Sequence, residues 1–229
     1  MVGRPYTLLS CGMSIDGYVD DAAEDRLLLS NDADFDRVDA VRAGCDAILV
    51  GAATIRQDNP RLLVRSEERR RARVARGERP SPVKVTVTGS GELDPNAEFF
   101  AAGDGDKLVY CGTTALRTAR ERLGAVSTVV DGGDPVDLGL VATDLYERGI
   151  RRLMVEGGET VHTQFLTAGL ADELQLVVAP FFVGDSRAPR FVGDGAFPWG
   201  PGRRAELAEV RQIGDVALLR YKLSDRFRR

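Results

Sequence analysis

A pair of glycines behind a strand-like run is the first place where this sequence offers chemistry. Residues 152–155 (RLMV) form a short apolar run, Glu156, Gly157 and Gly158 follow directly, and a helical pattern comes next. Glycines let the backbone approach a ligand closely, and the amides at a helix N-terminus favour an anion. The spacing matches neither a dinucleotide fingerprint nor a P-loop, so it indicates a phosphate-binding turn or only a tight turn. Glu156 itself stands at a strand end, where open α/β sheets bind their ligands.

A second polar cluster follows another apolar run, residues 46–51 (DAILVG). Thr54 and Asp58 are four residues apart, which places them on one face of a helical turn. The Asn59–Pro60 step ends that turn, and Arg65 lies beyond it. Any single arginine is most often a solvated surface residue. Three polar groups of different kinds behind one strand nevertheless favour a ligand site.

The remaining candidate residues are less specific. Ser14 and Asp16 precede Gly17, and an Asp-Gly pair by itself signals only a turn. His162 is the chain's single histidine, and a lone helical histidine is more often a packing residue than a catalyst, although imidazole titrates near neutral pH. The 3 cysteines are far apart and include no Cys-x-x-Cys pair. We therefore expect no metal site and no Ser-His-Asp chemistry.

Composition narrows the class of protein further. The chain has 229 residues, 43% of them hydrophobic, and a formal net charge of -4, which is typical of a folded globular protein. A nucleic-acid or anionic-membrane partner would require a basic face, so we expect neither. No apolar run approaches the roughly 20 residues that span a bilayer, and the N-terminus does not read as a signal peptide. With its cysteines read as buried thiols, we expect a cytoplasmic protein.

Strand-like and helical patterns alternate along the chain. This alternation predicts an α/β fold with a mainly parallel central sheet flanked by helices, closed by a C-terminal antiparallel hairpin around residues 213–215. One densely charged stretch, residues 66–79, reads either as a solvated helix or loop or as a mobile basic flap near an anionic ligand. Strands are expected at 6–11, 46–51, 81–88, 107–111, 126–130, 152–155 and 173–179, and helices at 32–43, 114–123, 137–148 and 158–168.

Taken together, these segments resemble the reductase domain of bacterial riboflavin biosynthesis, a family with a dihydrofolate-reductase-like fold. The order and spacing agree over residues 6–223. The matching segments are MSIDG at 13–17, CDAILVGAATIRQDNPRLLVR at 45–65, and RRLMVEGGETVHTQFLTAGLADELQLVVAPFFVG at 151–184.

The resemblance implies hydride transfer from NADPH to the C1′ of a ring-opened ribosyl group on a ribosylaminopyrimidine 5′-phosphate, which yields a ribityl chain. Asp58, a bound water or the ribose itself would supply the proton, and Asp58 is the residue we name as catalytic. The implied cofactor-binding residues are Ser14, Asp16, Gly51, Thr54, Asp58, Ser90, Gly157, Gly158, Glu159, Thr160, Val161, His162, Thr163 and Gln164. The implied substrate-binding residues are Ser30, Arg42, Leu62, Arg65 and Glu156.

The chain also departs from the family's pattern. The sequence lacks the zinc-deaminase motif that often precedes this reductase, so we expect a stand-alone domain over residues 1–229 with a charged insertion at about 66–80. Thr88-Gly89-Ser90 stands where the family often has an acidic residue. The family commonly forms homodimers, and we expect one here.

Two other functions stay open at this stage. One is a dihydrofolate-reductase-like or specialised-metabolism NADPH reductase acting on a related pterin or pyrimidine, and the other is a nucleotide-binding module without turnover. Retention of both Arg42 and Arg65 favours a phosphorylated substrate.

Overall fold

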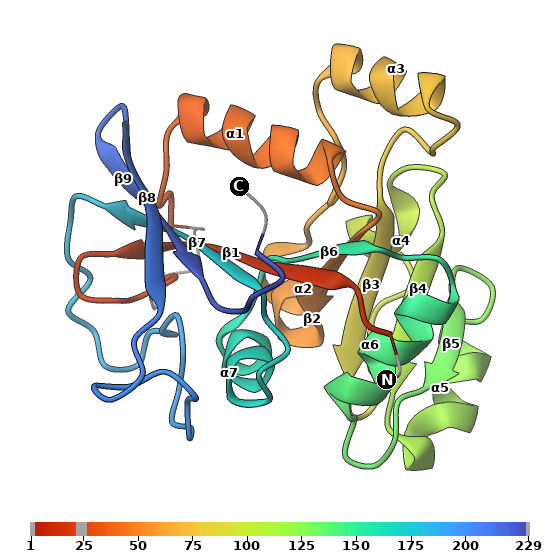
Figure 1. The fold of residues 1–229 in the computed structure, drawn as a ribbon. Coiled ribbons are helices and arrows are strands. Elements are labelled where there is room, and N and C mark those ends of the chain that lie inside the picture. Colours follow the sequence, from red (N-terminus) through yellow and green to blue (C-terminus); the bar gives the residue numbers. More distant parts are fainter. Residues whose placement is uncertain (1–2, 22–26, 228–229) are drawn as a thin grey trace. The chain divides into compact units, whose positions relative to one another are not determined.

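The computed structural model describes residues 3–21 and 27–227, which group into two compact units (Figure 1). Unit one consists of Met1–Pro5 and Asp39–Met154, and unit two consists of Tyr6–Val38 and Val155–Arg229. The chain therefore enters each unit twice. The expected single domain over residues 1–229 stays a prediction.

The sheet of unit one has the strand order β5-β4-β3-β2-β6. The pairs β2–β3, β3–β4 and β4–β5 are all parallel. Every residue of β2 is buried, which agrees with the continuous apolar run expected for a strand covered on both faces. The strands are β2 (Ala47–Gly51), β3 (Val83–Thr88), β4 (Lys107–Cys111), β5 (Thr128–Asp131) and β6 (Arg152–Val155).

Helices follow most of these strands, as the alternating patterns predicted. Helix α6 begins behind Asp137, whose carboxylate accepts hydrogen bonds from the backbone amides of Gly139 and Leu140. Helix α1 (Asp32–Ala43) runs from unit two into unit one. The other helices are α2 (Ala52–Asp58), α3 (Glu67–Ala75), α4 (Glu98–Ala101), η1 (Thr113–Ala115), α5 (Leu116–Leu123) and α6 (Leu138–Glu147).

The charged stretch 66–79 contains helix α3, as its first interpretation expected. The helix is anchored, because the side chain of Arg73 is buried. Its guanidinium donates to the carbonyl oxygens of Ala43 (2.9 Å), Cys45 (2.8 Å) and Arg79 (2.9 Å). The bond to Ala43 satisfies a carbonyl group in the last turn of α1, and the bond to Cys45 satisfies one just beyond that helix. The structure therefore favours a docked helix over a mobile flap.

A buried lysine shapes the other side of unit one. The amino group of Lys84 in β3 donates to the carbonyl oxygens of Phe99 (2.9 Å) and Ala102 (2.6 Å). Burial, together with the neighbouring charge of Lys107, lowers the pKa of Lys84 to about 8. These bonds hold the short helix α4, which the sequence patterns did not predict.

Unit two has the strand order β1-β7-β9-β8. Strand β1 pairs with β7 in parallel, whereas β7–β9 and β9–β8 are antiparallel. The hairpin turns at Gly214, whose φ of 61° is a conformation that glycine adopts readily. The elements are β1 (Tyr6–Ser14), α7 (Glu159–Thr167), β7 (Glu173–Ala179), β8 (Glu206–Ile213) and β9 (Val216–Lys222).

The two faces of the unit-two sheet differ in chemistry. Along β7, Leu174 and Leu176 lie on one face, while Glu173 and Gln175 lie on the other. Glu173 is fully buried, and its carboxylate accepts hydrogen bonds from the hydroxyl of Tyr6 (2.7 Å) and the guanidinium of Arg220 (3.0 Å). One face is therefore apolar, and the other contains a buried polar network.

The expected fold class is confirmed: an α/β protein with mainly parallel pairing and an antiparallel C-terminal hairpin. None of the three cysteines, Cys11, Cys45 and Cys111, takes part in a disulfide in the described part of the chain. None of the helices in the described part of the chain has both the length and the apolar character needed to cross a membrane.

Candidate functional site

The glycine turn behind β6 is built as an anion-binding element would be. Gly157 has a φ of 123°, a left-handed conformation that favours glycine, and the peptide bond to Gly158 is cis. Gly158 is the N-cap of α7 and has no side chain with which to cap it. The first amides of α7, from Glu159 to Val161, thus start a nine-residue helix without a side-chain cap from Gly158. Such amides, with the helix dipole, favour a phosphate.

Of the α7 residues other than His162 that are expected to bind the cofactor, two use their side chains to hold a loop, two are exposed and one is buried. The carboxylate of Glu159 accepts a hydrogen bond from the amide of Arg190 (2.6 Å). The hydroxyl of Thr163 accepts one from the amide of Gly193 (2.9 Å) and donates to the carbonyl oxygen of Glu159 (2.8 Å). Both side chains thus hold the loop at residues 190–193. Thr160 and Gln164 are exposed, and Val161 is buried, so only the backbone of Val161 is left to meet a ligand.

His162 lies beneath the glycine turn. Its side chain is 1% exposed, and its ring packs against Phe191 with centroids 5.3 Å apart. A Cβ built on Gly157 would lie 3.7 Å from the imidazole Cε1. Within the described residues, no hydrogen bond of good geometry reaches either ring nitrogen, but the backbone of Val155 and of Phe191 lies close enough to favour the protonated ring. Burial outweighs these contacts and lowers the pKa of His162 to about 4. The imidazole is therefore neutral at physiological pH and is not a proton donor there.

These features fit the phosphates of a nicotinamide cofactor. The turn offers backbone without side chains, the helix begins with uncapped amides, and the buried nitrogens of His162 lie directly behind the turn. The sequence identified this turn, but it did not indicate that His162 lies under it.

The two candidates at the end of β1, Ser14 and Asp16, are hydrogen-bonded to each other, and Asp16 is also hydrogen-bonded to a loop. The hydroxyl of Ser14 donates to Asp16 Oδ1 (2.5 Å) and accepts a hydrogen bond from the amide of Tyr18 (3.0 Å). Asp16 also accepts from the amides of Val183 (3.1 Å) and Gly184 (2.8 Å). The bond from Ser14 is the main cause that lowers the pKa of Asp16, so this carboxylate is ionised at neutral pH. Its contact with a cofactor stays a prediction.

In unit one, helix α2 starts directly at the end of β2. Gly51 is its N-cap and provides no side-chain cap, and Thr54 and Asp58 are both half-buried. Asn59 ends the helix in a left-handed conformation with a φ of 43°, and its side-chain oxygen accepts a hydrogen bond from the amide of Glu98 (2.7 Å). The helix thus ends before Pro60, as the Asn-Pro step predicted.

One candidate substrate residue of unit one, Arg65, lies beside a buried carboxylate. Asp39 is 3% exposed and accepts hydrogen bonds from the amides of Arg65 and Ser66 and from the guanidinium of Arg69 (3.0 Å). Burial raises its pKa, but these three bonds outweigh that effect, so the net pKa is lowered. The backbone amide of Arg65 ties this segment to Asp39, and the side chain of Arg65 is exposed. No sequence signal had marked Asp39.

Two other substrate-side candidates of this unit are Arg42 and Leu62. Arg42 donates a hydrogen bond to the carbonyl oxygen of Leu63 (3.2 Å). Leu62 has a left-handed backbone with a φ of 49° and a side chain only 3% exposed. Any contact of Leu62 with a substrate would therefore come from its backbone.

Glycine-rich loops line the same edge of the unit-one sheet. Ser90 is exposed behind β3, and the next loop is so close that a Cβ on Gly112 would lie 2.8 Å from the carbonyl oxygen of Gly89. Behind β4 and β5, the hydroxyl of Thr113 donates to Asp131 Oδ1 (2.7 Å). The parallel register brings these strand ends together, but Thr113 and Asp131 were not among the candidates.

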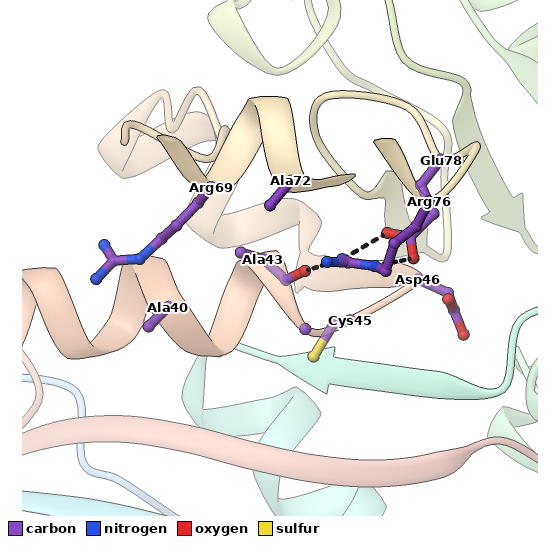
Figure 2. A pocket seen from close by; sticks show the side chains of 9 residues that line it. Ala40, Ala43, Cys45, Asp46, Arg69, Ala72, Arg76 and Glu78 are labelled. Atoms are coloured by element: carbon purple, nitrogen blue, oxygen red, sulfur yellow. Dashed lines mark hydrogen bonds and ion pairs between the residues drawn. The ribbon is translucent and has the colours of Figure 1, made fainter. Parts of the chain in front are cut away.

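A pocket in unit one contains none of the candidates (Figure 2). It lies where α1 ends and β2 has not yet begun. Its charged side chains are paired, since Arg76 bonds Glu78 (2.9 Å) and Arg69 bonds Asp39. Small side chains supply much of the rest of its lining. The lining residues are Ala40, Ala43, Gly44, Cys45, Asp46, Arg69, Ala72, Arg76 and Glu78.

Across residues 3–21 and 27–227, no group of three or more His, Cys, Asp or Glu side chains is placed to hold a metal ion.

The chain is similar to known reductases over nearly its whole length. Residues 5–219 match the family model described as the RibD C-terminal domain. A 2,5-diamino-6-ribosylamino-4(3H)-pyrimidinone 5′-phosphate reductase of Methanothermobacter thermautotrophicus is 34% identical over 221 residues, covering 95% of this chain and 98% of the relative. The protein of the same name from Archaeoglobus fulgidus is 29% identical, covering 93% and 95%.

Solved structures support the fold. A pyrimidine reductase-like protein of Corynebacterium diphtheriae superposes with a TM-score of 0.79 at 22% identity, covering 95% of this chain and 91% of that one. A deaminase/reductase of Thermotoga maritima superposes with a TM-score of 0.77 at 23% identity, and the match covers 96% of this chain and 56% of that longer one.

Proposed function

Because the chain belongs to the family of the RibD C-terminal domain, we propose that it reduces a ribosylaminopyrimidine 5′-phosphate with NADPH. The ribosyl group would become a ribityl group, as in riboflavin-type biosynthesis. The observation that carries this proposal is the turn Glu156–Gly157–Gly158 before the uncapped start of α7, in a chain that matches reductases of this substrate class end to end. On this proposal, the polar residues around the turn bind the cofactor or the substrate.

NADPH supplies the hydride when it is bound. The amides of Glu159 to Val161 and the exposed hydroxyl of Thr160 would hold its phosphates. Thr54, Asp58 and Ser90 are the cofactor-side residues that the family assigns within unit one. The protein's part in the reaction is then to align two reactants and to provide charge complementarity.

The substrate is an anion with polar sugar and base groups. Arg65, with its exposed side chain, and Arg42 would pair with its phosphate. Glu156 would accept hydrogen bonds from sugar hydroxyls or ring amines, and the backbone of Leu62 and the side chain of Ser30 would complete the substrate contacts.

The chemical step needs both a hydride and a proton. Ring opening of the ribosylamine frees the 4′-hydroxyl and leaves a C1′=N imine. The hydride would add to C1′ of this imine, and a proton would neutralise the nitrogen that takes up the electron pair. We assign Asp58 to this proton transfer. In a pH–rate profile of Asp58→Asn, loss of one ionisation relative to the wild type would support the assignment, and an unchanged profile would reject it.

One experiment tests the function as a whole. NADPH oxidation is followed with the aminated and the deaminated ribosylaminopyrimidine phosphates and with dihydrofolate, side by side, and then with NADH replacing NADPH. Rapid turnover of one ribosylaminopyrimidine phosphate with NADPH supports the proposal. Turnover of dihydrofolate alone would favour the pterin-reductase alternative, and cofactor binding without any turnover would favour a nucleotide-binding module.

We also propose that the chain forms a homodimer through the apolar face of the unit-two sheet. Leu207 and Val210 on the edge strand β8 are 51% and 61% exposed. They lie opposite Tyr221 and Leu219 of β9, so the strand alternation places them on one face. A large exposed apolar face next to an edge strand favours association. A solution mass equal to one 24.8 kDa chain would contradict the dimer.

We place this reductase in the cytoplasm as one domain over residues 1–229. Cys11, Cys45 and Cys111 are thiols that form no disulfide among the described residues, which is consistent with a reducing compartment. Fractionation of cells that produce the protein, followed by activity assays on each fraction, tests the location.

A further inference from the structure

Two residues before α1 lies a serine, Ser30, whose hydroxyl proton is held in a hydrogen bond. The hydroxyl of Ser30 lies 2.6 Å from Asp34 Oδ2. The other oxygen of Asp34, Oδ1, accepts a hydrogen bond from Arg37 Nε at 2.5 Å. The side chains of Asp34 and Arg37 are only 4% and 11% exposed. Because a carboxylate paired with arginine only accepts hydrogen bonds, Ser30 must be the donor in this pair.

A chain of hydrogen bonds fixes this direction from behind. Arg37 also donates to the side-chain oxygen of Gln175 (2.6 Å), and the amide nitrogen of Gln175 donates to Glu173 (2.7 Å). Each donor in this chain faces an acceptor. Reversing any one of the bonds would place two donors or two acceptors against each other. The network therefore holds Asp34 as the acceptor of both hydrogen bonds.

The backbone around Ser30 is held as well. Asn31 Oδ1 accepts a hydrogen bond from the amide of Asp34 (3.1 Å), which caps α1. Asn31 Nδ2 donates to the carbonyl oxygen of Ile213 (2.8 Å), at the end of β8. Ser30 is half-buried, so its remaining lone pairs have a fixed direction.

We propose that Ser30 meets the substrate as a hydrogen-bond acceptor and that Asp34 is the positioning residue that makes it one. Ser30 would then take a hydrogen bond from a sugar hydroxyl or an exocyclic amine of the ribosylaminopyrimidine, and it would not donate to the phosphate. This inference rests on the proposed function. It goes further by stating the polarity of one contact and by naming a residue behind it.

The test compares steady-state kinetics of Ser30→Ala, Asp34→Asn and the double variant. We expect KM for the ribosylaminopyrimidine phosphate to rise about tenfold in each single variant, with kcat within about twofold of wild type and with NADPH affinity unchanged. The double variant should be no worse than either single variant, because both remove one unit. Inorganic phosphate should inhibit wild type and Ser30→Ala equally well.

Ser224→Ala is the matched control. The hydroxyl of Ser224 donates to buried Asp172 (2.5 Å) in the same unit, so this variant removes the same type of bond away from α1. It should lower the melting temperature and leave KM unchanged. KM effects that multiply in the Ser30/Asp34 double variant, or weaker phosphate inhibition of Ser30→Ala, would overturn the proposal.

A second readout does not depend on turnover. Hydrogen exchange of the backbone amides at residues 27–35 should be about tenfold faster in Asp34→Asn than in wild type, and unchanged in Asp32→Asn, which alters an exposed carboxylate of the same turn. If the wild type reduces no ribosylaminopyrimidine phosphate, the proposed function fails, and the assigned Ser30 contact fails with it. Unchanged exchange in Asp34→Asn, in an enzyme that does turn over the substrate, would reject Asp34 as the positioning residue alone.

Discussion

The carboxylate of Asp16 accepts a hydrogen bond from the backbone amide of Gly184 over 2.8 Å. This bond ties the end of β1 to the loop behind β7, and a second one from the amide of Val183 strengthens the tie. Replacing the carboxylate by an amide in Asp16→Asn should make the amides of Val183 and Gly184 exchange about tenfold faster. Amide hydrogen exchange by NMR measures this.

Asp185→Asn is the matched control for Asp16. Asp185 lies in the same loop, but its hydrogen bonds go to Arg187 two residues away, so this variant should leave the β1 contact intact. Equal exchange rates in wild type and Asp16→Asn would show that other contacts hold the loop.

A large side chain at Gly158 should block the cofactor. The Gly158→Trp variant places an indole at the N-cap of α7, in front of the amides that we assign to phosphate. Affinity for NADPH, measured by fluorescence titration, should fall at least a hundredfold. Gly158→Ala serves as the smaller change, and thermal unfolding of both variants separates misfolding from blocking. A folded Gly158→Trp protein with wild-type affinity would remove this turn from the cofactor site.

Loss of the Arg65 side chain should weaken substrate binding selectively. Its backbone amide bonds Asp39, so Arg65→Ala leaves that anchor in place. We expect KM for the phosphorylated substrate to rise by roughly tenfold to a hundredfold, with little change for NADPH. Arg61→Ala, in the same segment and paired only at the surface with Glu98, should change neither. Equal losses for substrate and NADPH would move Arg65 out of the substrate role.

The single histidine should make the protein less stable in mild acid. Burial lowers the pKa of His162 from 6.5 to about 4. In that window the unfolded chain binds a proton at this residue and the folded chain does not, so stability falls as pH falls from 6.5 towards 4. The contribution is on the order of 3 kcal/mol.

His162→Phe keeps a ring against Phe191 and removes the ionisation. Urea unfolding across this pH range should therefore show a flatter pH dependence for the variant than for wild type. Parallel curves for the two proteins would mean that the buried carboxylates alone cause the loss of stability in acid.

The buried guanidinium of Arg73 should be the main anchor of α3. In Arg73→Met the carbonyl oxygens of Ala43 and Cys45 lose their donor, which should cost about 2–4 kcal/mol of unfolding free energy. Arg71 is 77% exposed and pairs with Glu67, so Arg71→Ala should cost less than about 0.5 kcal/mol. Urea denaturation of both variants measures the difference, and similar small losses would contradict the anchoring role.

Local patterns in the sequence predicted most elements of this fold. The runs DAILVG and ELQLVVA become β2 and β7, and the turn signal at Gly214 lies in the β8–β9 hairpin. These predictions depend on neighbouring residues alone, which is why they agree with the structure. Helix α4 was missed because it spans only Glu98–Ala101, too short for a helical period, and it is held by Lys84 from another strand.

The sequence predicted which positions belong to the candidate site, but not which contacts their side chains make. The glycine turn and the helix behind it were visible in the sequence, since strand, glycine pair and helix are adjacent in the chain. The uses of Glu159 and Thr163 were not, because their partners Arg190 and Gly193 are about thirty residues away.

The sequence alone determined the α/β class, the family resemblance and the places where backbone without side chains is available. Only the tertiary structure decided which polar groups are buried. Asp34 and Asp39 lie in a helix of ordinary charged composition, yet each is 3% exposed and holds donors that its own turn or another segment supplies. A carboxylate is stable in such a place only when several donors converge on it, and that convergence is a property of the folded chain.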